Sequence, residues 1–200
     1  MTAILLKQPE AVFIHIPKTA GRTVRALWGG DIKAPVSKGV MPDDWVNIYT
    51  FAFVRHPQAR LISAYNMFSK GTKHIESGKV VSRRVAPLEG ISFEGFVNKM
   101  FDEDDRDQQW SVTSHTLPMT DPYNLIQYAD FVGKQEKFEH DMQLVAKDVG
   151  LRLDSHFPQV NVSEKDKSRL EVWADLPPAL QAKVLDYYAE DFETFNYEEF

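Results

Sequence analysis

The chain has 200 residues, which fits a single domain over residues 1–200, and 43% of them are hydrophobic, which excludes a disordered chain. A formal net charge of −6 argues against general nucleic-acid binding, and the absence of cysteine excludes disulfides and thiolate sites. No apolar stretch reaches the length of a membrane span, and residues 1–7 are too short for a secretory signal.

The first predicted elements form a strand, a turn and a helix. Residues 11–16 are apolar and predict a buried strand, and apolar residues at helical spacing predict a helix over residues 21–29. The turn between them holds Lys18 and the hydroxyls of Thr19 and Thr23. A helix start offers unpaired N–H groups and the positive end of its dipole, so this turn favours a phosphate or a sulfate.

The turn differs from the Walker loop of nucleoside triphosphatases. That loop places its lysine after the second of two glycines, whereas Lys18 precedes Gly21 and the first glycine is missing. A nucleoside triphosphatase is therefore disfavoured. The alternative that Lys18 is merely solvated, in an ordinary strand–turn–helix unit that binds no anion, remains open.

A second strand, loop and helix follow. Residues 48–54 are a continuous apolar run, as expected for a strand covered on both faces, and residues 58–69 predict a helix. Arg55 lies at the end of that strand, with Arg60 and Ser63 in the helix. Ligands of open α/β sheets bind at the carboxyl ends of the strands. Two such units side by side could hold two separated phosphate groups of one ligand.

The rest of the chain predicts three further helices, a short strand and an irregular stretch. Residues 92–102 and 136–149 carry apolar stripes typical of helices, and a helix over 178–190 opens on prolines. A short strand is predicted near residues 130–133, and residues 103–130 are expected to be irregular.

Two charged stretches carry no clear signal. Residues 70–84 hold five lysines and arginines and one glutamate, and a solvated loop and a flexible flap over a cofactor or an anionic acceptor both stay open. Residues 102–107 are acidic but lack the spacing of a calcium loop, so a solvated helix end is favoured and no metal is predicted.

Two segments resemble motifs of the PAPS-dependent sulfotransferases, where PAPS is 3′-phosphoadenosine-5′-phosphosulfate. Residues 13–23 resemble the loop for the 5′-phosphosulfate, and residues 53–65 resemble the 3′-phosphate motif, with its arginine and serine at the family's separation. The match is closer to the carbohydrate branch, which includes the heparan sulfate 2-O-sulfotransferases and bacterial relatives. Residues 131–141, 161–163 and 187–197 are also similar to family segments.

The resemblance implies a three-layer α/β/α fold with a central parallel sheet and a P-loop-like 5′-phosphosulfate loop. It implies an enzyme that moves the sulfuryl group from PAPS to a hydroxyl of an acceptor, with a saccharide favoured. The partners are then PAPS, its product PAP (adenosine 3′,5′-bisphosphate) and the acceptor. The implied cofactor-binding residues are Lys18, Thr19, Ala20, Gly21, Arg22, Thr23, Arg55 and Ser63.

The resemblance also bears on the cellular compartment and on one unusual residue. Relatives in animal cells are usually anchored in the Golgi membrane, so the lack of an anchor here favours a cytoplasmic enzyme. Arg22 departs from the family pattern, since many relatives have a small hydroxyl residue there. It either adds a phosphate contact or points away.

Catalysis requires a cation and a base. Lys18 is expected to stabilise the charge on the bridging oxygen of the leaving group, and a general base must take the acceptor proton. The heparan sulfate enzymes carry a histidine between the two motifs, but residues 24–53 contain none, so that role does not transfer. His115 is the preferred candidate and His74 the next, although a surface or hydrogen-bonded His115 stays open.

Two other histidines have a structural interpretation, and two other functions stay as alternatives. His15 and His56 are interpreted as hydrogen-bonded structural residues. A nucleotide-binding protein without catalysis stays open because the family histidine is missing. A kinase-like phosphoryl transferase would need Mg²⁺ and a lysine after the second glycine, which is absent.

Overall fold

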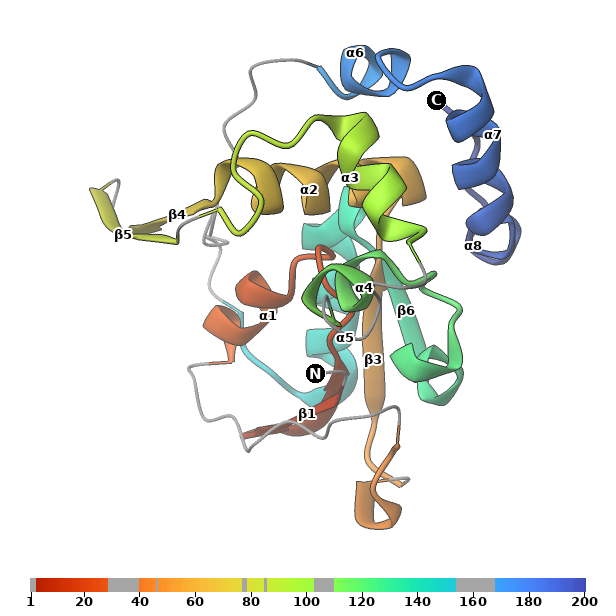
Figure 1. Ribbon diagram of the computed structural model, residues 1–200. Coiled ribbons are helices and arrows are strands. Elements are labelled where there is room, and N and C mark those ends of the chain that lie inside the picture. The colour runs from red at the N-terminus through yellow and green to blue at the C-terminus, as the bar shows by residue number, and fades with distance from the viewer. Residues whose placement is uncertain are drawn as a thin grey trace. The chain divides into compact units, whose positions relative to one another are not determined.

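A computed structural model of the chain describes residues 3–28, 40–45, 47–76, 79–84, 86–102, 110–153 and 168–200 (Figure 1). Contacts between Cα atoms divide the chain into two compact units, each described here by itself. The first unit comprises Met1–Arg55 and Met119–Gln159, and the second comprises His56–Pro118 and Val160–Phe200. A single domain over residues 1–200 stays a prediction.

A four-stranded sheet, in the order β1-β2-β3-β6, forms the centre of the first unit (Figure 1). Its strands are β1 (Ala3–Lys7), β2 (Glu10–Ile14), β3 (Thr50–Val54) and β6 (Phe131–Lys134). β2, β3 and β6 are parallel, and every residue of β3 is buried, as its apolar run predicts. The mostly parallel sheet, flanked by helices, confirms the predicted α/β class.

β1 was not predicted, and it makes the sheet mixed. It runs antiparallel to β2, with Lys7 paired to Glu10, so only Gln8 and Pro9 form the turn. Antiparallel strands need no more than such a two-residue connection, whereas a parallel neighbour needs a long crossover. The short apolar run that opens the chain therefore extends the sheet as a hairpin.

Helices α1 (Gly21–Leu27) and α5 (Phe138–Val149) pack against the sheet, which confirms both predicted helices. The shared apolar cluster joins strand residues to one stripe of each helix: Ile4, Leu6, Ala11, Phe13, Phe51 and Phe53 with Val24, Trp28, Met142 and Val145. This packing fixes the ends of β2 and β3, where the two candidate loops begin.

Short 3-10 turns cover Asp43–Trp45, Pro122–Asn124, Ile126–Tyr128 and Gln135–Lys137.

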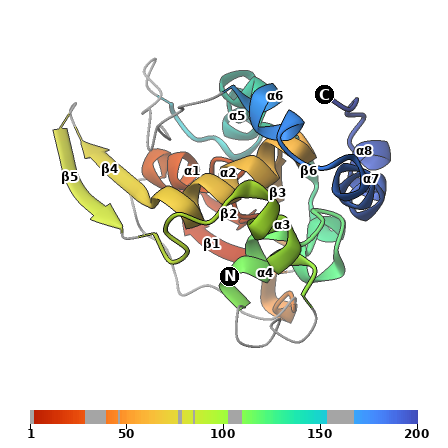
Figure 2. The same cartoon turned by 45° about the horizontal axis from the view of Figure 1, so that its top comes forward.

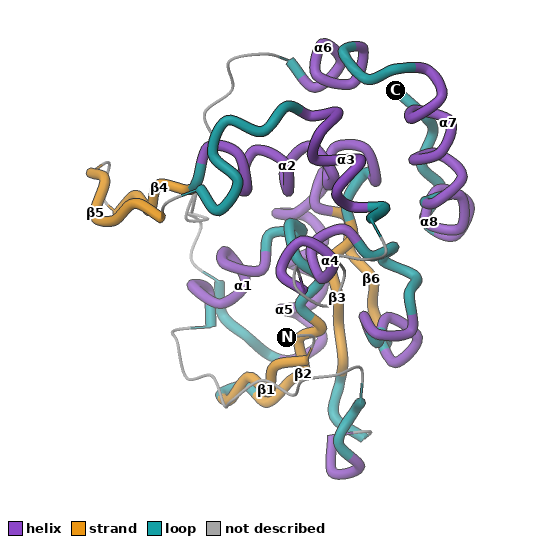
Figure 3. Tube along the Cα trace, in the orientation of Figure 1, coloured by secondary structure: helices purple, strands orange, loops and turns teal. Residues whose placement is uncertain are grey.

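The second unit is mainly helical (Figure 3). Its helices are α2 (Pro57–Lys70), α3 (Phe93–Met100), α4 (Trp110–Thr116), α6 (Arg169–Ala174), α7 (Pro178–Tyr187) and α8 (Ala189–Thr194). α2, α3, α4, α6 and α7 supply one apolar core. α4 lies in a stretch expected to be irregular. Its serines, threonines and valine have weak helix propensity, and its contacts come from distant segments, so the local sequence does not indicate a helix.

The basic stretch forms a second sheet rather than a loop. β4 (Thr72–Glu76) and β5 (Lys79–Arg84) pair as an antiparallel hairpin, and His74 pairs with Ser82 (Figure 2). A role over a cofactor or an acceptor stays a prediction. Among the described residues, no helix is long and apolar enough to cross a membrane, and the cytoplasmic location also stays a prediction.

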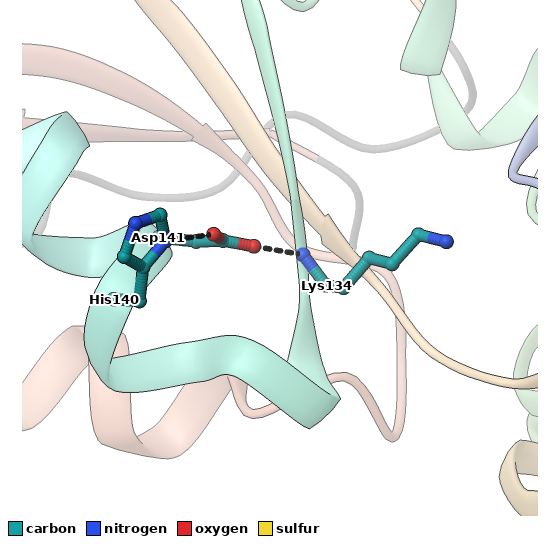
Figure 4. A network of polar contacts seen from close by, with 3 residues as sticks. All are labelled: Lys134, His140 and Asp141. Carbon is teal, nitrogen blue, oxygen red and sulfur yellow. Dashed lines mark hydrogen bonds and ion pairs between the residues drawn. The ribbon is translucent and has the colours of Figure 1, made fainter.

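The Asp141 carboxylate, on α5, connects the start of this helix to the end of β6 by a hydrogen bond (Figure 4). It accepts hydrogen bonds from the Lys134 backbone N–H at 2.7 Å and from His140 Nδ1 at 2.9 Å. The backbone of Gly133 lies close to both Phe53 and Asp141. A Cβ at this position would be 2.6 Å from the Phe53 ring and 3.0 Å from Asp141 Cβ, so a larger residue would clash. The turn from strand to helix thus depends on one buried carboxylate and one residue without a side chain.

Asp141→Ala is expected to lower the free energy of unfolding by about 1–3 kcal/mol, because the Lys134 N–H loses its acceptor in a partly buried position. His140→Ala is the matched control, since the His140 side chain is 71% exposed and an exposed pair contributes little. Urea denaturation measures both variants. Equal destabilisation by the two changes would show that Asp141 does not hold this turn.

Candidate anion site

The loop between β2 and α1 has an unusual backbone. Lys18 and Ala20 have φ values of 72° and 75°, in the left-handed region that residues with a Cβ rarely adopt. Such conformations cost about 1–3 kcal/mol each and concentrate at binding and active sites. The loop is therefore held in a defined shape from Lys18 to the start of α1.

Two contacts inside the loop maintain this shape. Thr19 is fully buried, and its hydroxyl donates a hydrogen bond to the Ile16 carbonyl at 2.8 Å. Gly21 faces the His15 ring so closely that a Cβ would lie 2.1 Å from His15 Cδ2. The hydroxyl of Thr19 thus donates within the loop, as a buried hydroxyl needs a partner in the fold, and a contact of Thr19 with the anion stays a prediction.

Arg55 joins the second loop to the first. β2 and β3 are parallel neighbours, with Ile14 opposite Ala52, so the two loops begin at the same edge of the sheet. The Arg55 side chain is buried, and its Nη1 donates to the Lys18 carbonyl at 3.2 Å. The sequence predicts the shared edge, but not that the guanidinium of Arg55 contacts the loop of Lys18.

Three cations gather here, and they change the ionisation of Lys18. Burial, together with the positive charges of Arg55 and Arg22, lowers the pKa of Lys18 from 10.5 to about 8. Lys18 is half-buried and Arg22 is exposed. Like charges held this close repel one another, and a bound anion would offset both this repulsion and the cost of burying the charged lysine. The geometry therefore fits a polyanionic ligand.

The amides at the start of α1 complete the candidate anion site. Gly21 and Arg22 lie in the first turn, where N–H groups have no acceptor within the helix. The N–H of Thr23 instead donates to the Ala20 carbonyl at 2.9 Å, which leaves its hydroxyl as the available donor. Direct contacts of these residues with a ligand stay predictions.

The second unit holds the other predicted residues. Ser63 is half-buried in the second turn of α2. Arg60 is fully buried, and its Nη2 donates to the carbonyls of Leu117 and His115 at 2.8 Å and 3.3 Å. The Arg60 guanidinium therefore binds backbone carbonyls at the end of α4.

His56 has a structural environment, as interpreted from the sequence. Its Nε2 hydrogen-bonds with the Glu198 carbonyl at 2.7 Å, and its ring stacks on Phe200 with 4.4 Å between centroids. The Phe200 N–H donates to the Gln58 side chain at 2.9 Å. The segment around Phe200 thus packs on the residues that open α2.

His115 lies near the end of α4 and is half-buried. Its ring meets the Phe68 ring edge-on, with 5.5 Å between centroids, and its Nδ1 hydrogen-bonds with Ser114 Oγ at 3.3 Å. These contacts fit either a positioned base or a structural histidine. Its catalytic role, and that of His74, stay predictions.

Metal ligands are a separate question. Within the described ranges, no group of three or more His, Asp or Glu side chains could hold a metal ion. Residues 103–107, most of the acidic stretch, lie outside these ranges. That the reaction uses no metal stays a prediction.

Known proteins share the sequence pattern of this chain. A sequence model described as the sulfotransferase family matches residues 34–198, a range that contains Arg55, Ser63 and His115. Carbohydrate sulfotransferase 14 of Danio rerio is 28% identical over 167 residues, which cover 74% of this chain and 44% of that protein. Carbohydrate sulfotransferase 11 of Rattus norvegicus is also 28% identical over 167 residues, which cover 74% and 46%.

The chain spans less than half the length of these two curated relatives. No solved structure matches the chain significantly. Lys18 precedes the range that the family matches, so its assignment depends on the geometry of the loop.

Proposed function

The chain belongs to the sulfotransferase family, and on this premise we propose that it transfers the sulfuryl group of PAPS to a hydroxyl of a saccharide. The observation that carries the proposal is the cluster of Lys18, Arg22 and Arg55 at one edge of the sheet. PAPS bears a 5′-phosphosulfate and a 3′-phosphate, so its several negative charges complement the positive charges of this cluster. A saccharide acceptor is supported by the names of the carbohydrate sulfotransferases that the chain resembles.

The proposal gives each loop residue a task. Lys18, the first-turn amides of Gly21 and Arg22 and the hydroxyl of Thr23 hold the 5′-phosphosulfate, and the positive end of the α1 dipole favours the same charge. Thr19 and Ala20 shape the loop, since one is bonded internally and the other has a left-handed backbone.

Arg55 and Ser63 bind the 3′-phosphate in this proposal. A buried guanidinium forms strong charge-assisted hydrogen bonds with phosphate oxygens. Since Arg55 also contacts the Lys18 carbonyl, binding at one phosphate fixes the loop that holds the other. The nucleotide is thereby positioned for the reaction, and positioning supplies a large part of the rate enhancement.

The reaction proposed is an in-line transfer at sulfur. The acceptor oxygen forms a bond to sulfur while the bond from sulfur to the bridging oxygen breaks, and PAP leaves with that electron pair. Negative charge grows on the bridging oxygen, where the ammonium group of Lys18 stabilises the transition state more than the ground state. The acceptor proton passes to a general base, which we assign to His115.

The affinity for PAP should fall as the pH rises above about 8, because the pKa of Lys18 is near 8 in the free protein. A neighbouring phosphate raises that pKa, so below pH 8 the lysine is protonated in both states and affinity does not change. Above pH 8 binding requires proton uptake, and affinity should drop by up to about tenfold per pH unit. Calorimetry between about pH 7 and 9.5 measures this.

Lys18→Arg is the matched control for the pH series. A guanidinium stays protonated throughout this range, so the affinity of this variant should not vary with pH. Buffers of different ionisation enthalpy report the proton uptake directly. An equal pH dependence in both proteins would exclude Lys18 as the titrating group.

A transfer assay separates the proposed function from the two alternatives. Radiolabelled PAPS is incubated with the protein and a panel of glycans, and label in the glycan demonstrates the enzyme. PAP binding with no transfer to any glycan would favour a binding protein without catalysis. Tight binding of ATP with Mg²⁺ in place of PAP would favour phosphoryl transfer, which the family does not support.

A further inference from the structure

A fully buried arginine holds the end of α4. The Nη2 of Arg60 donates to the Leu117 carbonyl at 2.8 Å and to the His115 carbonyl at 3.3 Å. The last carbonyls of a helix accept no hydrogen bond from an N–H of that helix, and they carry the negative partial charge of its dipole. A buried cation is well suited to this place, and it comes from α2.

A second buried residue binds the carbonyl between these two. The hydroxyl of Tyr188 donates to the Thr116 carbonyl at 2.5 Å, and Tyr188 is fully buried. Burial raises the pKa of Tyr188 far above its ordinary value, an effect that Arg60 opposes and that Tyr187 and Asp191 increase. Tyr188 therefore stays neutral and remains a donor at any pH at which the protein works.

Three consecutive carbonyls are thus fixed by two residues from distant segments. Burying a guanidinium is costly, and apolar residues of similar size often give equal or greater stability. The arrangement instead gives residues 115–117 a unique position, which apolar packing alone specifies less well.

His115 is the residue with acid–base chemistry in this fixed segment. Its backbone is held by Arg60, while its ring is limited by the Phe68 ring and by Ser114. Its side chain is nevertheless half-buried rather than enclosed. A proton acceptor must lie within hydrogen-bond reach of the acceptor hydroxyl, so a small displacement of this backbone would be costly.

We propose that Arg60 and Tyr188 are positioning residues, which hold the His115 imidazole in the orientation needed for proton transfer. This inference rests on the proposed function, since it gives His115 its task there. Neither residue contacts the nucleotide or the acceptor in this proposal. Both act through the carbonyls of residues 115–117.

Tyr188→Phe is the decisive variant, because it removes only the hydroxyl that binds Thr116 and keeps the aromatic packing. Tyr187→Phe is the matched control, since it removes a hydroxyl from the preceding residue of α7, whose ring packs against Phe101. Tyr188→Phe should lower kcat about tenfold with KM for PAPS and PAP affinity unchanged. Tyr187→Phe should leave all three unchanged.

A double-mutant cycle distinguishes positioning from general stability. If Tyr188 acts through His115, Tyr188→Phe should cause no further loss of activity in a His115→Ala background. A loss of the same size in both backgrounds would overturn the inference. Arg60→Lys, if it folds, should behave as Tyr188→Phe does, because a lysine cannot reproduce the two-carbonyl contact.

A readout without turnover keeps the inference separate from the proposed function. The nuclear magnetic resonance signal of the His115 Cε1 proton, assigned through its loss in His115→Ala, should shift in Tyr188→Phe and not in Tyr187→Phe. No shift in either variant would overturn the positioning role, even if the transfer assay succeeds. A shift without any sulfuryl transfer would instead leave the positioning intact and remove the proposed function.

Discussion

Lys18→Ala is expected to lower kcat by about 10²–10³-fold, with a smaller change in KM for PAPS. Negative charge on the bridging oxygen grows only in the transition state. The Lys18 ammonium therefore stabilises the transition state more than the ground state, and its loss lowers kcat. Arg25→Ala is the control, because Arg25 is an exposed cation on α1. Steady-state kinetics with varied PAPS measures both. A change confined to KM in Lys18→Ala would contradict the role given to the lysine.

Arg55→Ala provides the contrast. Its guanidinium is proposed to bind the 3′-phosphate in both ground and transition states, so its loss should mainly raise KM for PAPS. The contact of Arg55 with the Lys18 carbonyl adds a second effect, a smaller fall in kcat, because the loop loses one of its supports.

His115→Ala is expected to lower kcat by about 10²–10⁴-fold while PAP affinity stays the same, since the imidazole is proposed to take the acceptor proton and not to bind the nucleotide. His140→Ala is the control, because that histidine lies on the exposed surface of α5. Transfer assays and PAP calorimetry test both variants. Full activity in His115→Ala would exclude this base and direct attention to His74, the next candidate.

The elements that carry the candidate anion site could be predicted because their signals are local. The apolar runs before Lys18 and Arg55 and the helical stripes after them are short-range patterns, and the structure has strands and helices there. The long connection between β2 and β3 permits their parallel pairing, which brings the two loops to one edge.

The internal use of polar side chains could not be predicted, because it depends on partners distant in the sequence. Thr19 and Arg60 have the chemistry of phosphate ligands, and only the fold shows that both donate to backbone carbonyls. The same holds for α4, whose residues favour a helix weakly and whose support comes from Arg60 of α2 and from Tyr188, which follows α7. Gly21 gives a local signal for the shape of the loop. A glycine at the start of a helix suggests that another group lies close to its backbone, and here that group is the His15 ring.

The most direct test of a site for PAPS compares the affinities for PAP and for adenosine 5′-monophosphate by calorimetry. The two ligands differ only in the 3′-phosphate, which Arg55 and Ser63 are proposed to bind. Each charge-assisted hydrogen bond contributes about 1.5–3 kcal/mol, so PAP should bind at least about tenfold more tightly. This preference should disappear in Arg55→Ala. Equal affinity of the unaltered protein for the two nucleotides would contradict the assignment.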